Sequence, residues 1–124
     1  MKQLLKLTGC LAVAGLFVSC QSVQQEANYQ VIPLPQEIVV EQGVPFILKS
    51  GVKILYPEGN EKMQRNAKFL ADYLKTATGK DFTIEAGTEG KNAIILALGT
   101  ENENPEAYQL KVAGDGVTIT GSTE

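Results

Sequence analysis

The sequence predicts an α+β domain: a small mixed or antiparallel sheet with a helix on one face. Two observations lead to this fold. One segment repeats apolar residues with a helical period, and short β-rich runs separated by glycine and proline turns surround it. The chain has 124 residues, of which 44% are hydrophobic and 20% charged, and this length suits one modest globular domain.

Residues 1–19 have the architecture of a signal peptide. Lys2 and Lys6 precede a short apolar run over residues 7–18, and this run falls short of the roughly 20 apolar residues that cross a bilayer. We therefore expect this segment to direct export and then to be removed.

The end of the apolar run, Phe17–Cys20, resembles the lipobox of bacterial lipoproteins. Cleavage at Cys10 or after Ala14 would leave almost no apolar core, which argues against both positions. Cys20 is therefore the expected lipid attachment residue and new N-terminus. The alternative, a small apolar residue or a disulfide between Cys20 and Cys10, is weak because both cysteines lie in the targeting segment.

Acyl chains on Cys20 would anchor the protein to a membrane. Polar residues dominate the segment 20–28, which we interpret as a tether between the anchor and the domain. The expected location is the bacterial cell envelope, lipid-anchored at the outer membrane on its periplasmic or surface face.

The first half of the domain predicts three short strands. Pro33 and Pro35 remove two amide donors, so the chain enters the domain as an edge or a connection. Residues 37–41, 46–48 and 52–56 follow as β-rich runs, separated by glycine turns.

A helix is predicted next, between an N-cap at Asn60 and a stop at Gly79. Its charged residues fall away from the apolar stripe and should face water. The stripe consists of Met63, Ala67, Leu70, Leu74 and Ala77.

Four more strands are expected, over 82–86, 93–98, 108–112 and 117–120, which gives about seven in all. The run 93–98 is apolar throughout and suits a central strand covered on both faces. The last two runs form a hairpin around Gly114-Asp115-Gly116. Either possible turn places Val112, Val117 and Ile119 on one face, where we expect them to be buried.

Catalytic motifs are absent from the sequence. The chain has no histidine, which removes Ser-His-Asp and Cys-His nucleophile arrangements and most zinc sites. No phosphate loop or dinucleotide fingerprint fits its glycines, and a net charge of −3 without a basic stripe argues against nucleic acid as a partner. We predict no catalytic, substrate-binding or metal-binding residue, and no cofactor.

An acidic cluster, Glu101, Glu103 and Glu106, lies in a loop that also contains asparagine and proline. We interpret it as a solvated patch. A calcium site is the sharper alternative, but the loop lacks the Asp and Gly spacing of a known calcium loop.

Several motifs together resemble the N-terminal non-catalytic domain of bacterial β-N-acetylhexosaminidases, glycoside hydrolase family 20. These are the Pro33-x-Pro35 motif, the Gly43–Phe46 turn, the helix and the hairpin that closes in residues 119–124. The resemblance implies that residues 29–124 form an accessory domain, truncated before a second helix and without the catalytic barrel.

The resemblance also implies a parent enzyme that releases terminal N-acetylhexosamine from glycans, with the barrel as the partner of this domain. Catalysis in that family uses an adjacent Asp-Glu pair, and no Asp-Glu dipeptide occurs in this chain. Two alternatives stay open: a free-standing surface lipoprotein that binds a glycan or a protein, and the accessory domain of another glycosidase such as an α-glucuronidase.

Overall fold

The structure, a computed structural model, describes residues 28–100 and 102–124. The predicted signal peptide, Cys20 and most of the tether lie outside the described residues. The chain divides into two units, residues 1–39 and 40–124. In the first unit, residues 28–39 contain no helix or strand, while the second unit contains the sheet and the helix.

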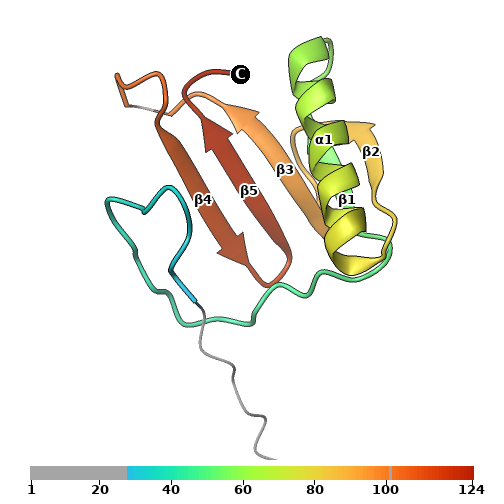
Figure 1. Ribbon diagram of the computed structural model, residues 1–124, viewed down its shortest axis with the longest axis horizontal. Coiled ribbons are helices and arrows are strands. Elements are labelled where there is room, and N and C mark those ends of the chain that lie inside the picture. Colours follow the sequence, from blue (N-terminus) through green and yellow to red (C-terminus); the bar gives the residue numbers. More distant parts are fainter. Residues whose placement is uncertain (1–27, 101) are drawn as a thin grey trace, which may run out of the picture. The chain divides into compact units, whose positions relative to one another are not determined.

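Five strands form one mixed sheet in the order β2-β1-β3-β5-β4. Three of the pairings are parallel, namely β1 with β2, β1 with β3 and β3 with β5, whereas β4 and β5 form an antiparallel hairpin (Figure 1). This confirms the predicted fold class in its mixed form. The strands are β1 (Lys53–Tyr56), β2 (Thr83–Ala86), β3 (Ala93–Leu98), β4 (Tyr108–Ala113) and β5 (Gly116–Gly121).

Two of the predicted strands, 37–41 and 46–48, are wrong, because both segments lack strand structure. Phe46 and Leu48 pack against the core, while Ile47 between them is 67% exposed. The alternation that suggested a strand is therefore real, but it describes an extended segment that has no ladder partner. An apolar residue at every second position indicates which side chains are buried. It does not show that the backbone forms hydrogen bonds with a neighbouring strand.

The helix α1 (Glu61–Thr78) lies within the predicted limits. Asn60 Oδ1 accepts a hydrogen bond of 3.0 Å from the backbone amide of Met63, as an N-cap does. At the other end, Gly79 adopts a left-handed conformation with φ 69°, and its amide donates to the carbonyl of Lys75 at 2.8 Å. Glycine adopts this conformation without strain, which explains why the helix ends there.

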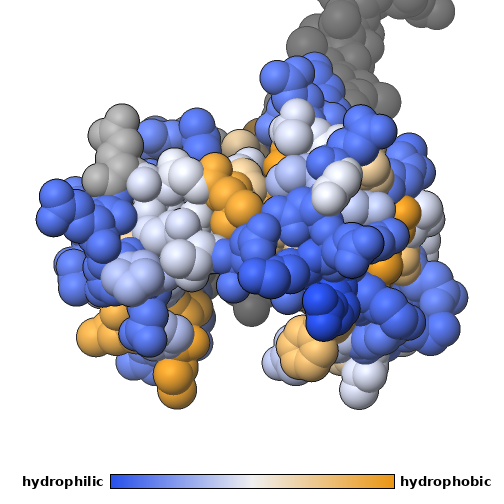
Figure 2. All heavy atoms as spheres, turned by 90° about the horizontal axis from the view of Figure 1, so that it is seen from above, coloured by the Kyte–Doolittle hydropathy of each residue, from blue (hydrophilic) through white to orange (hydrophobic). Residues whose placement is uncertain are grey.

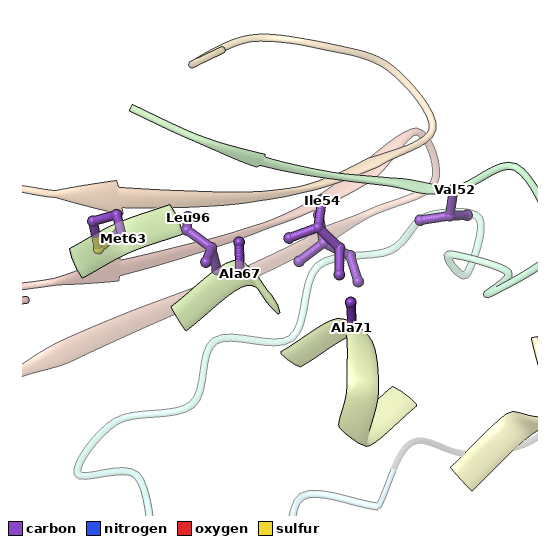
Figure 3. Packing of buried hydrophobic residues seen from close by; sticks show 7 residues of the cluster. Val52, Ile54, Met63, Ala67, Ala71 and Leu96 are labelled. Atoms are coloured by element: carbon purple, nitrogen blue, oxygen red, sulfur yellow. The ribbon is translucent and has the colours of Figure 1, made fainter. Parts of the chain in front are cut away.

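The core lies between α1 and the sheet (Figure 3). Met63 and Ala67 of the predicted stripe are buried, and Leu70 and Leu74 are half-buried against the core. Ala77 is exposed because it lies at the end of the helix, beyond the sheet contact. The remaining core residues are Val52, Ile54, Ala71, Ile94 and Leu96.

The helix covers only part of the sheet: α1 lies over β1 and β2 (Figure 1). Every residue of β4 is exposed. The predicted burial of Val112 is therefore wrong, since this side chain is 59% exposed, whereas Val117 and Ile119 are half-buried against the core. All three residues do share one face, because Val112 pairs with Val117 and Leu110 with Ile119. The edge position of β4, away from α1, explains the difference.

Replacing Asn60 with alanine should lower the free energy of unfolding by about 1 kcal/mol, because the Met63 amide would lose its capping oxygen. Urea unfolding of the chain checks this value. Asn60→Ser is the matched control, because serine also caps helices, and it should retain most of the stability. Equal losses in the two variants would contradict the capping role.

Candidate functional site

The described residues were examined first for a metal-binding cluster and for a membrane-spanning helix. Within 28–100 and 102–124, no group of three or more His, Cys, Asp or Glu side chains is placed to hold a metal ion. In the same part of the chain, no helix is both long enough and apolar enough to cross a membrane.

The acidic loop points its carboxylates outward. Glu103 and Glu106 are exposed, as the sequence predicts, and Glu101 lies outside the described residues. The asparagine side chains fold back on the loop: Asn102 Oδ1 accepts from the Asn104 amide, and Asn104 Oδ1 accepts from the Glu106 amide, both at 2.9 Å. These local bonds shape the turn and leave the acidic groups in solvent.

A polar clamp joins the last residue to the start of α1. Asn60 Nδ2 donates to Glu124 Oε1 at 2.7 Å, and Lys62 Nζ lies 2.9 Å from Glu124 Oε2. The hydrogen bond from Lys62, followed by that from Asn60, lowers the pKa of Glu124 below its ordinary value. The clamp therefore contributes its stability above the ordinary pKa of a glutamate and loses it as pH falls through the lowered value. It links Glu124, which lies after the end of β5 at Gly121, to the start of α1.

A groove runs between α1 and the uncovered half of the sheet. Met63, Asn66 and Leu70 form the helix wall, and Leu96 and Ile119 contribute from β3 and β5. Gly121 and Thr123, just before the clamp, also line it. The groove is therefore mostly apolar, and one end of it lies where the chain leaves β5.

Two aromatic residues of α1 are exposed to solvent. Phe69 and Tyr73 are 75% and 65% exposed. Each follows a groove-lining residue, Asn66 or Leu70, by three positions, and residues three apart share a helix face. Neither aromatic therefore contributes to the core.

Exposed apolar side chains also lie on β4. Leu110 pairs with Ile119 of the groove, and it is 49% exposed. Tyr108 and Val112 lie two positions on either side of it, so alternation places all three on one face of the sheet. Seen from above, hydrophobic residues interrupt the hydrophilic surface in several places (Figure 2). We name the following set the open apolar surface: Tyr108, Leu110, Val112 and Ile119.

Two exposed aromatic residues of α1 can be recognised in the sequence although they belong to no motif. Phe69 and Tyr73 are large apolar residues that fall off the predicted core stripe of the helix. Aromatic residues on the outer side of a soluble helix are typical of a contact surface.

The fold and its surface define the class of protein: a small α+β module with an uncovered apolar side. Comparison with known families then gives the affiliation. The chain belongs to glycosyl hydrolase family 20, because residues 28–124 match the model of domain 2 of that family.

Among solved structures, the chain is similar to the GH20 β-N-acetylhexosaminidase from Streptomyces coelicolor A3(2), with 32% sequence identity and a TM-score of 0.62. The similarity covers 74% of this chain and 18% of the streptomycete chain, so this chain corresponds to a minor part of that enzyme. A comparison with curated proteins gave no match. These findings confirm the resemblance to the non-catalytic domain of this family.

Proposed function

We propose that this chain is the accessory domain of a β-N-acetylhexosaminidase and is non-catalytic by itself. The observation that carries the proposal is the match to domain 2 of family 20 over residues 28–124. The similarity to a β-N-acetylhexosaminidase at 32% identity supports the same activity for the parent protein. The domain would brace the catalytic barrel, which would release terminal N-acetylhexosamine from glycans.

Activity measurements test this proposal directly. The parent protein, read from the gene beyond codon 124, should hydrolyse a chromogenic N-acetylglucosaminide. The purified 124-residue chain should show no turnover under the same conditions, since it lacks the Asp-Glu pair that the family uses. Turnover by the short chain would contradict the non-catalytic assignment, and a parent without turnover on N-acetylhexosaminides would contradict the proposed activity.

A lipid anchor at Cys20 forms the second part of the proposal. The sequence pattern around Phe17–Cys20 supports it, together with the polar tether up to residue 28. Acylation would keep the enzyme in the bacterial cell envelope, and the tether and accessory domain would hold the barrel away from the membrane.

The variant Cys20→Ala should abolish incorporation of a labelled fatty acid in bacteria that express the protein, because the acylated thiol is lost. Cys10→Ala is the matched control and should keep the label. The reverse result, with label lost only in Cys10→Ala, would move the attachment residue to Cys10.

A further inference from the structure

We propose that the outer edge of β4 pairs with β4 of a second copy of this chain, as two antiparallel strands related by a two-fold axis at Leu110. The inference does not depend on the proposed function, because it uses only the sheet of residues 40–124. It is supported by the length and exposure of β4, by the direction of its backbone groups and by the order of its side chains.

β4 is the longer of the two edge strands of the sheet. It has six residues, all exposed, and its ladder partner is β5, whereas β2 at the other edge has four residues (Figure 1). Edge strands are commonly protected by proline, by a bulge or by small length. β4 contains no proline, and its pairs with β5 run from residue 108 to residue 113 without a bulge. Its edge is therefore suited to pairing with another strand.

The hairpin determines which backbone groups of β4 point outward. The two-residue turn at 114–115 is flanked by Ala113 and Gly116, a pair that exchanges hydrogen bonds. Hydrogen-bonded and non-hydrogen-bonded pairs alternate from there, so the amide and carbonyl of Val112 and of Leu110 point away from β5. Among the described residues, no backbone hydrogen bond joins Leu110 or Val112 to a segment other than β5. These groups can therefore bond to an added antiparallel strand.

The apolar side chains of β4 favour one register. Directly opposite residues of an antiparallel pair point to the same face of the sheet. An axis at Leu110 places Leu110 opposite its own copy, and Tyr108 opposite Val112 of the second copy. Pairs of an aromatic and a β-branched residue are among those that stabilise sheets. This register therefore joins apolar residues to apolar residues along one face.

The charge on β4 favours the same register. Lys111 is the one charged residue of the strand, and it points to the face opposite Leu110. With the axis at Leu110, Lys111 lies opposite Gln109 of the second copy. An axis at Lys111 would instead place two lysines directly opposite each other, which is destabilising. The strand therefore matches a second copy of itself best when each lysine meets an uncharged amide.

Disulfide cross-linking tests both the pairing and its register. The chain of residues 21–124 contains every described element and no cysteine, so Leu110→Cys introduces a single thiol. At the axis, the two Cα atoms would lie about 5.5 Å apart, within the range of about 4.4–6.8 Å that a disulfide spans. Gln109→Cys is the matched control, because its two copies would lie on a diagonal, about 7–8 Å apart. Leu110→Cys should form the covalent dimer at least about tenfold faster than Gln109→Cys.

A charge exchange at the axis provides a second test. Leu110→Lys and Leu110→Glu each place like charges opposite each other, so both variants should sediment as monomers at concentrations where the unmodified chain is a dimer. An equal mixture of the two variants should form the dimer again, because opposite charges then meet. Leu110 is 49% exposed, so both variants should stay folded, which far-UV circular dichroism checks.

Four results would overturn the inference. The first is a chain of residues 21–124 that sediments as a monomer at every concentration. The second is equal cross-linking of Leu110→Cys and Gln109→Cys, which would indicate random collision. Faster cross-linking of Lys111→Cys than of Leu110→Cys would move the axis to Lys111. A dimer that persists in both Leu110→Lys and Leu110→Glu would place the contact away from β4.

Discussion

Replacing Ile54 with alanine should lower the free energy of unfolding by about 3 kcal/mol, the largest loss that we expect from a single core residue in this chain. Ile54 is 0% exposed and lies on β1 between two strands, where it pairs with Ile84 of β2 and Ile94 of β3. Its side chain points towards Ala67 and Ala71 of α1 (Figure 3). Neither alanine can extend to fill the space that the truncation leaves.

The magnitude is large compared with the total stability of a small domain, which is typically about 5–15 kcal/mol. Urea unfolding of the chain of residues 20–124 measures the loss. Ile47→Ala is the matched control, because Ile47 is exposed, and it should change stability by less than about 0.5 kcal/mol. Where the alanine variant does not fold, Ile54→Val should still lose about 1 kcal/mol. Equal effects at positions 54 and 47 would contradict the placement of the core.

Replacing Gly116 with alanine should cost about 1–3 kcal/mol of folding free energy. A Cβ atom at this position would lie 2.9 Å from the carbonyl oxygen of Ala93. Gly116 pairs with Ala93 of β3 on one side and with Ala113 of β4 on the other. Because the close atom belongs to the backbone, a side-chain rotation cannot relieve the contact and the strands must shift.

Gly43→Ala is the matched control for this substitution. No atom approaches within 4 Å of a Cβ at Gly43, so the same chemical change should leave the free energy of unfolding nearly unchanged there. Thermal and urea unfolding of the two variants provide the comparison. A Gly116→Ala variant as stable as Gly43→Ala would show that β3 and β5 are not packed as closely as described.

The helix and the last five predicted strands could be derived from the sequence because local signals agreed with the tertiary structure. Asn60 and Gly79 delimit α1, and the run at 93–98 became the central strand β3. The apolar period also identified the face that packs on the sheet. In these segments propensity, pattern and capping all favour the same structure.

The wrong predictions concern which elements pair or pack with one another, whereas the periodicity of the side chains was predicted correctly. Phe46 and Leu48 alternate as a strand does, but no neighbouring strand pairs with them. The hairpin prediction placed Val112 on the correct face, yet burial also depends on whether α1 reaches that strand. A sequence pattern indicates which side chains of a strand or helix share one face. Whether another element covers that face depends on the rest of the fold.

The open apolar surface was not predicted for the same reason, because its exposure depends on the rest of the fold. Phe69 and Tyr73 belong to no motif of the sequence, so their exposure was not predicted. The groove likewise joins Met63, Asn66 and Leu70 of α1 to residues of β3 and β5, which lie far along the chain. Only the topology brings these residues together.

The strand order also has a consequence for synthesis. Ile54 of β1 pairs with Ile94 of β3, and β3 in turn pairs with β5 near the end of the chain. Contacts between segments so far apart require long loops to close first, which slows folding. During translation, β1 and α1 leave the ribosome well before β3, their central partner. The central strand β3 gains its second neighbour only when β5 is present, so we expect the domain to complete its folding only after the last strand has emerged.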